Sequence, residues 1–265
     1  SRMSHDIRTP MNAIIGMTTI AESHLDDTER ISDCLNKITI SSKHLLSLIN
    51  EVLDMSKIES GKIDLAEEEF SISDLIQNLL TMVRPNMQAK NHKIELNIAK
   101  VEHEDVIGDV MRLQQVFMNI LGNAVKYTPP GGTLELEITE KESKSFGYGC
   151  YEFVFRDNGI GMSEEFVRKI FEPFSRAEDS RISKIEGTGL GMAIALNIVR
   201  MMNGNITVES EVNEGSKFTV TVFLKQQNTQ MPDMNQFAGQ PVLVVDDDEF
   251  ACEAACTILR DIGMN

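Results

Sequence analysis

Residues 4–10 read Ser-His-Asp-Ile-Arg-Thr-Pro and place three chemically active side chains close together on one predicted helix. His5 is the central one, because a neutral imidazole is a competent nucleophile near pH 7. Asp6 follows it directly and can orient the ring and accept its proton. Thr9 shares the face of His5 one turn later, and Pro10 removes a backbone donor, which predicts a bend. The run predicts a nucleophilic histidine, although a single surface histidine usually has no such role.

A second polar group lies in the predicted helix 109–127. Asn119 and Asn123 are four residues apart, so both amides project from one face of the helix. Neutral oxygen ligands suit Mg²⁺ shared with phosphates, and Lys126 adds a point charge for phosphate. The alternative is an ordinary polar helix face, which is weakened because asparagine is a poor helix former.

A turn of the type Asp-Asn-Gly begins at Asp157, directly after an alternating strand. A carboxylate held at a strand end can accept a hydrogen bond from the amino group of adenine. Gly159 and Gly161 let the backbone approach a flat ring closely. The turn alone is weak evidence, because a glycine turn after a strand is common.

A glycine-rich turn opens the next predicted helix; it consists of Gly187, Thr188, Gly189, Leu190 and Gly191. Such a turn presents backbone N–H groups and the positive end of the helix dipole to anions. The spacing is not that of a P-loop, and the turn does not follow a strand as in a dinucleotide-binding motif. Taken alone it also fits a flexible loop.

Two amphipathic helices must carry the first motif, one over 3–25 and one that begins near Asp27 or Thr28. Apolar side chains recur in steps of three and four, as in the seam of a helical bundle. An antiparallel hairpin buries little alone, so we expect a four-helix bundle made with a second copy. The predicted seam is Met3, Ile7, Pro10, Ile14, Met17 and Ala21, followed by Ile31, Leu35, Ile38, Ser42, Leu45, Ile49 and Val52.

Strands and helices then alternate without the regularity of a parallel fold, which predicts an α+β sandwich with helices on one face. We expect the strands to join antiparallel and the other face to be largely solvated. The predicted strands are 70–72, 93–98, 133–139, 151–156, 205–210 and 217–224, and the helices are 73–90, 109–127 and 192–202. After a polar linker, a continuous apolar strand ends in Asp246 and Asp247, as at the start of a parallel α/β domain.

The composition limits the possible partners. The chain has 41 acidic and 25 basic residues, a formal net charge of −16, so we expect no nucleic-acid binding. Any site for a polyanion such as ATP must then be local and depend on metal, helix N-termini and a few cations. The four cysteines show no metal-ligand spacing, which indicates a reducing compartment. No apolar run approaches the ~18 residues of a membrane span, so we expect no membrane contact within this sequence.

The run from His5 to Pro10 resembles the H-box of sensor histidine kinases, whose histidine accepts a phosphoryl group. The resemblance implies that His5 is autophosphorylated with the assistance of Asp6. It also implies that Thr9 positions water for the reverse, phosphatase reaction on a response regulator.

The run that starts at Asn119 resembles the N-box of the GHKL ATPase superfamily, which includes these kinases. This resemblance implies that Asn119 binds Mg²⁺ with Asn123 nearby. Lys126 and Tyr127 then contact the nucleotide.

Asp157 and the glycines after it resemble the adenine-reading motif of the same superfamily. The segment Phe171–Arg176 resembles the F-box and the start of the lid, and it implies that Arg176 contacts phosphate. Residues 242–248 resemble the first strand of a receiver domain, with Asp246 and Asp247 as its Mg²⁺-binding pair.

The resemblance covers residues 1–225 or so and implies a protein histidine kinase that uses ATP and Mg²⁺ in two-component signalling. It implies a homodimer through the hairpin, a response-regulator receiver as partner and a cytoplasmic location. Because the sequence opens with Ser1, we expect a fragment whose missing part can hold a membrane anchor. The expected domains are the hairpin (1–65), the ATP-binding domain (66–226), a linker (227–240) and the receiver start (241–265).

Two other functions use part of the same motifs. A GHKL ATPase that gates a clamp shares Asn119, Asp157 and the glycines but has no use for the motif around His5. A degenerate kinase that only dimerises does not require intact nucleotide-binding residues. Steady ATP turnover without self-labelling would favour the clamp-type ATPase. Absence of nucleotide binding would favour the degenerate kinase.

Overall fold

The computed structural model describes residues 2–60, 65–143, 145–176 and 188–227, together with Val242, Leu243, Val245 and Cys256. For residues 2–6 and 59 it describes the backbone alone. Contacts divide the chain into residues 1–227 and 228–265, and the elements below all belong to the first unit. No helix of the described residues is long and apolar enough to cross a membrane. Of the predicted receiver strand 242–248, only Val242, Leu243 and Val245 are described, none of them as part of a strand, and Asp246 and Asp247 lie outside the described residues.

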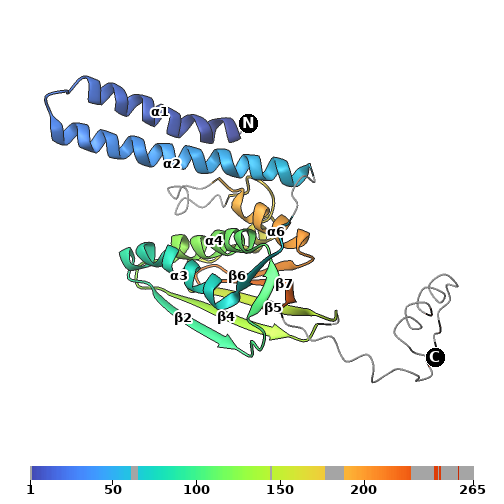
Figure 1. The fold of residues 1–265 in the computed structure, drawn as a ribbon. Helices are drawn as coiled ribbons and strands as arrows, with labels where there is room; N and C mark the ends of the chain where they lie inside the picture. Colours follow the sequence, from blue (N-terminus) through green and yellow to red (C-terminus); the bar gives the residue numbers. More distant parts are fainter. Residues whose placement is uncertain are drawn as a thin grey trace. The chain divides into compact units, whose positions relative to one another are not determined.

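The N-terminal part is an antiparallel hairpin of α1 (Arg2–Glu22) and α2 (Thr28–Glu59) (Figure 1). Asp27 caps α2, because its carboxylate accepts a hydrogen bond from the backbone N–H of Arg30 at 3.0 Å. The helix therefore begins where it was expected, with Asp27 and not Thr28 as its cap, while α1 ends three residues earlier than expected. The helix also continues through Pro10, which is buried.

Within one chain, two residues of the predicted apolar seam of α2 are not buried in the hairpin, and a seam shared with a second copy stays a prediction. Leu35 and Ile49 are 56% and 41% exposed, whereas Cys34 and Leu48, one residue before each, are buried. The pair Cys34 and Leu48 and the pair Leu35 and Ile49 both have heptad spacing. Periodicity alone therefore does not indicate which pair is buried inside the hairpin of one chain. Large apolar side chains remain exposed along the hairpin: Met11, Ile15, Leu25, Leu35, Ile40, Leu46, Ile49 and Leu53.

The second part is built on one seven-stranded sheet with the order β1-β3-β7-β5-β4-β2, and β6 also pairs with β7 (Figure 1). The strands are β1 (Glu68–Ser71), β2 (Lys93–Ala99), β3 (Asp105–Gly108), β4 (Thr133–Lys141), β5 (Tyr148–Asp157), β6 (Asn205–Glu211) and β7 (Gly215–Gln226). The pairs are antiparallel except β2 with β4, which is parallel. The expectation of antiparallel joins is thus wrong at this edge, and β3 adds a strand that was not predicted.

Three helices cover one face of the sheet: α3 (Ile72–Ala89), α4 (Val110–Tyr127) and α6 (Gly191–Met201), while α5 (Glu164–Val167) is a single turn (Figure 1). The core lies between these layers. Phe117 of α4 packs against Phe153 and Phe155 of β5, with ring centroids 4.6 and 5.4 Å apart. The other face carries ion pairs such as Arg156 with Glu135 at 3.1 Å. The predicted α+β sandwich is confirmed.

The start of α4 is fixed by the side chain of Asp109, which is only 8% exposed. One carboxylate oxygen accepts a hydrogen bond from the backbone N–H of Arg112 at 3.0 Å and so caps the helix. The other oxygen accepts from the backbone N–H of Ala66 at 3.1 Å. The same carboxylate therefore ties α4 to the chain that arrives from the hairpin.

The end of α4 is fixed by the ammonium group of Lys90, which follows α3. Its Nζ donates to three carbonyl oxygens that the helix leaves without an intrahelical partner. They belong to Val125 at 2.9 Å, Lys126 at 2.8 Å and Thr128 at 3.3 Å. A cation at this position also complements the helix dipole. The polar face of α4 is thus held at both ends.

Candidate functional site

A pocket of about 1020 Å³ is lined by α4, the end of β5, the segment 160–176 and the turn before α6. Its volume suits a ligand of nucleotide size. Most of the predicted binding residues line it: Asn119, Asn123, Lys126, Tyr127, Asp157, Gly161, Arg176, Thr188, Gly189 and Gly191. Gly159 and Leu190 lie next to lining residues rather than in the wall, and Gly187 falls outside the described residues.

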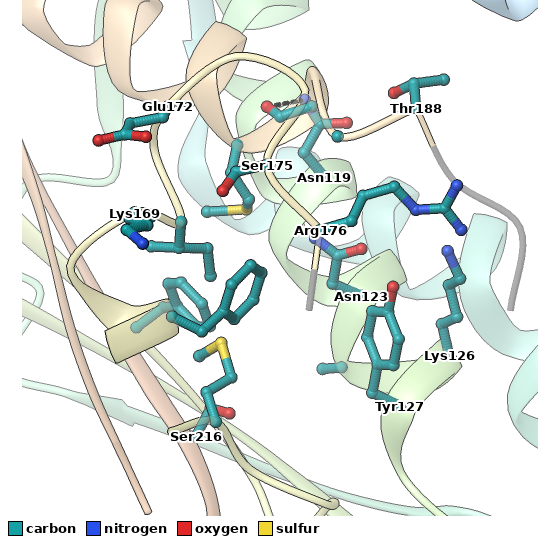
Figure 2. Close-up of a pocket in the computed structure, with 18 of the residues that line it drawn as sticks. Asn119, Asn123, Lys126, Tyr127, Lys169, Glu172, Ser175, Arg176, Thr188 and Ser216 are labelled. Atoms are coloured by element: carbon teal, nitrogen blue, oxygen red, sulfur yellow. Dashed lines mark hydrogen bonds between the residues drawn. The ribbon is translucent and has the colours of Figure 1, made fainter. Parts of the chain in front are cut away.

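The two asparagines of α4 both line the pocket, as their spacing predicts (Figure 2). The side-chain Nδ2 of Asn119 donates to the carbonyl oxygen of Gly191 at 3.0 Å, which joins α4 to the start of α6. The amide oxygen of Asn119 is then the atom suited to a hard cation. No cluster of three or more His, Cys, Asp or Glu side chains that could hold a metal occurs in the described part of the chain. The donor set therefore fits Mg²⁺ that is shared with phosphates and water.

Positive charge gathers at one side of the pocket. Figure 2 shows the side chains of Lys126 and Arg176 reaching toward the same space beside Tyr127. The Lys126 Nζ lies 4.9 Å from the centre of the Tyr127 ring. Burial raises the pKa of Tyr127, and the charge of Arg176 opposes that rise. The protein is strongly acidic as a whole, so these two cations supply the local field that a polyanion needs.

Asp157 ends β5 and places its carboxylate in the pocket wall. Its Oδ1 accepts a hydrogen bond from the backbone N–H of Gly159 at 2.8 Å. Burial raises the pKa of Asp157, while the backbone N–H groups of Gly159 and Ser216 oppose the rise. A partly desolvated acceptor of this kind binds a donor such as a ring amino group strongly.

The glycines after Asp157 are required by close backbone approach. At Gly159 a Cβ would lie 2.6 Å from Asp157 Oδ1. At Gly161 the backbone has φ +61°, and a Cβ would lie 1.8 Å from the carbonyl oxygen of Glu211. Any larger residue at either position displaces the turn that holds the carboxylate.

The glycine-rich turn forms another part of the pocket wall. Gly189 has φ +73°, and its carbonyl oxygen accepts a hydrogen bond from the backbone N–H of Phe174 at 3.0 Å. The hydroxyl of Thr188 accepts from the backbone N–H of Leu190 at 3.1 Å and donates to Glu51 of α2 at 2.5 Å. Leu190 is buried and begins α6. The turn is therefore held by both the sandwich and the hairpin.

Sequence reasoning did not predict several residues that line the pocket, among them His44, Glu51 and Ser216. His44 and Glu51 are seven residues apart and so share a face of α2, but nothing in their own spacing relates them to residues more than a hundred positions away. Ser216 follows Gly215, whose φ of +110° allows the chain to pass close to Asp157. The pair of Gly215 and Ser216 at the start of a strand was the local signal in the sequence that could have pointed to Ser216.

The motif around His5 lies on α1. The backbones of His5 and Asp6 are helical, and their side chains lie outside the described part, while Thr9 is exposed. Glu22 and Thr28 flank the hairpin turn, so positions with numbers that sum to about 50 lie level with each other. The backbone of His5 is therefore level with α2 near His44, which lines the pocket.

Two family models match the chain. Residues 1–61 match the His Kinase A (phospho-acceptor) domain, and residues 108–226 match the histidine kinase-, DNA gyrase B- and HSP90-like ATPase domain. The first match falls on the hairpin and the second on the sandwich that holds the pocket.

Full-length relatives and a solved structure resemble the chain. The sensor histidine kinase GacS of Pseudomonas protegens is 34% identical over all of this chain and 29% of its own length. The autoinducer 2 sensor kinase/phosphatase LuxQ of Vibrio vulnificus is 32% identical over 97% of the chain and 31% of its own length. Full-length ShkA in complex with AMPPNP has the same fold, with a TM-score of 0.64 and 24% identity over 100% of this chain and 53% of that one.

The chain thus spans less than a third of the length of the two curated relatives. Within that span the two matched domains follow one another in the same chain, and the described parts of both contribute side chains to one pocket. The chain belongs to the sensor histidine kinases.

Proposed function

We propose that this chain transfers the γ-phosphoryl group of ATP to His5 and that the phosphohistidine then phosphorylates an aspartate of a response-regulator receiver domain. The observation that carries the proposal is the pocket itself. Its wall contains both a partly desolvated carboxylate, Asp157, and residues of α2 from the acceptor hairpin. Nucleotide and phosphoacceptor can therefore meet within one fold.

Asp157 accepts a hydrogen bond from the adenine amino group in this proposal. Asn119, with Asn123 nearby, would hold Mg²⁺ through its amide oxygen, and this ion would supply charge neutralisation for the phosphates. Lys126 and Arg176 contact phosphate oxygens. The AMPPNP carried by ShkA, a protein of the same fold, supports an adenine nucleotide as the ligand.

The glycine-rich turn completes the nucleotide site. The backbone N–H groups around Gly189 and the start of α6 face the phosphates, where the helix dipole favours negative charge. Tyr127 lies beside the cations and covers the nucleotide from the end of α4. Gly159 and Gly161 let the strand end approach the base.

The reaction is an in-line displacement. A ring nitrogen of His5 forms a bond to the γ-phosphorus while the bond between this phosphorus and the bridging oxygen breaks, and ADP leaves. Asp6 accepts the ring proton. The protein contributes mainly positioning and charge neutralisation, because phosphoryl transfer needs little covalent chemistry from side chains.

The exposed apolar side chains of the hairpin support a second copy of the chain as the partner that completes a four-helix bundle. The proposed domains are the hairpin (1–65), the ATP-binding domain (66–226), the linker (227–240) and the receiver start (241–265). Thr9 is exposed one turn after His5, where it can position water for dephosphorylation of a regulator. The name of LuxQ, a sensor kinase/phosphatase, supports that second activity.

Incubation of the chain with γ-labelled ATP tests the proposal. We expect label that is stable in base and lost in acid, as for a phosphorus–nitrogen bond. His5→Gln should abolish it, and Asp157→Asn should abolish both the label and nucleotide binding. Acid-stable label, or steady ATP hydrolysis without any labelled chain, would contradict the proposal and favour a clamp-type ATPase.

A further inference from the structure

The contact between Thr188 and Glu51 joins the glycine-rich turn to α2. The Thr188 hydroxyl donates to Glu51 Oε2 at 2.5 Å, and both residues line the pocket. They are separated by more than a hundred positions in sequence. An acidic side chain from the hairpin is therefore bonded to the wall that should bind phosphate.

The hydroxyl of Thr188 has a single proton. It donates this proton to the carboxylate of Glu51 and uses a lone pair to accept the backbone N–H of Leu190 at 3.1 Å. A phosphate oxygen is an acceptor and can bind the hydroxyl only through the same proton. Phosphate and Glu51 therefore cannot hold Thr188 at the same time.

The negative charge of Glu51 also opposes the binding of phosphate near Thr188. A carboxylate that lines a pocket for a triphosphate repels the bound anion. The Ser47 hydroxyl, one turn earlier on α2, also donates to Glu51, from 3.3 Å to Oε1. After Thr188 is taken by phosphate, Glu51 thus retains a hydrogen-bond donor on its own helix.

A second polar contact holds α2 against α4 away from the pocket. Asp54 accepts a hydrogen bond from Gln115 Nε2 at 2.8 Å, and its carboxylate lies 3.4 Å from Arg112. Neither Arg112 nor Gln115 lines the pocket. The contact at Asp54 can therefore persist when the contact at Thr188 is broken.

We propose that Glu51 is a positioning residue that competes with the γ-phosphate for the Thr188 hydroxyl, so that ATP binding releases this part of α2 from the glycine-rich turn. The inference rests on the proposed function. It adds that a triphosphate, and not a diphosphate, is the ligand that separates the two elements.

The test measures the affinity of Glu51→Gln for ADP and for a non-hydrolysable ATP analogue, both with Mg²⁺, by calorimetry. A neutral amide accepts the Thr188 proton more weakly and does not repel phosphate, so analogue affinity should rise about fivefold. ADP affinity should stay within about twofold. The gain should vanish in a Thr188→Val background, which has no proton to share.

Asp33→Asn is the matched control, because it removes an exposed carboxylate of α2 that pairs with Lys37 at 2.7 Å. We expect wild-type affinities for both nucleotides in this variant. Equal changes for ADP and the analogue in Glu51→Gln, or a gain that persists with Thr188→Val, overturn the inference alone. A wild-type chain that binds neither nucleotide overturns the proposed function and the inference with it.

Discussion

Replacement of Lys90 by methionine tests whether the end of α4 is held as the structure indicates. The substitution keeps most of the aliphatic chain and removes three hydrogen bonds from a charged donor to the carbonyl oxygens of Val125, Lys126 and Thr128. Hydrogen bonds to charged groups contribute about 1.5–3 kcal/mol each and are not additive here, because one ammonium makes all three. Lys90 is only partly buried, so water replaces some of the loss.

We expect the free energy of unfolding to fall by about 2–4 kcal/mol, including the lost interaction with the helix dipole. Urea denaturation followed by circular dichroism measures this, with an unchanged m-value as a check on the unfolding model. Nucleotide affinity should fall as well, because the last turn of α4, which Lys90 no longer holds, carries Lys126 and Tyr127. Lys93→Met, at an exposed position three residues away, is the control. A loss below about 1 kcal/mol, or one equal to that of the control, refutes the reasoning.

Three other substitutions test the site and its supports. Gly161→Ala should abolish nucleotide binding and cost more stability in urea than Gly131→Ala, because a Cβ at Gly161 would lie 1.8 Å from a backbone oxygen, whereas at Gly131, also at positive φ, none of the described atoms lies within 4 Å. Asp157→Asn should abolish ADP binding yet leave the melting temperature of the unliganded chain at pH 7 equal or higher, because burial raises the pKa of Asp157 and so penalises its charge. Burial also acts to raise the pKa of Glu140, but hydrogen bonds from His103 and a neighbouring backbone N–H hold it below the usual 4.5. The stabilisation by Glu140 is therefore complete above pH 4.5 and is lost as the pH falls through its lowered pKa. Urea titrations of Glu140→Gln across this range should show a flatter dependence on pH than the wild type, and an identical slope would contradict the assignment.

Alternation and capping predicted most of the sandwich because they act locally. In β4, for example, Leu134, Leu136 and Ile138 are fully buried while the residues between them are not. This alternation is visible in the sequence and predicts the strand. β3 has one fully buried side chain, Val106, and its four residues are too few to show a period. Alternation also determines the face of a strand but not its neighbour, which is why the parallel pairing of β2 with β4 was not foreseen.

The candidate site was predictable where a motif is contiguous and not where the fold brings distant segments together. The amides of Asn119 and Asn123 share a face because they lie on one helix, whatever surrounds it. Glu51 reaches Thr188 only through the packing of α2 against the sandwich, and no local rule relates the two positions. Which apolar row of α2 is buried within one chain depended in the same way on packing, because the rows of Cys34 and Leu35 have equal spacing and only Cys34 is buried.

β7 has a mechanical consequence for the site. Its start carries Ser216, which lines the pocket beside Asp157, and its last residue, Gln226, donates a backbone N–H to Gly147 at 2.8 Å. Between these ends, a length of about 33 Å, the strand is bonded to β5 on one side and to β6 and then β3 on the other. A pull along the strand axis at the C-terminal end of β7 loads these bonds together in shear, not one after another. Tension from the C-terminal side is therefore absorbed by the sheet before it reaches the carboxylate in the pocket.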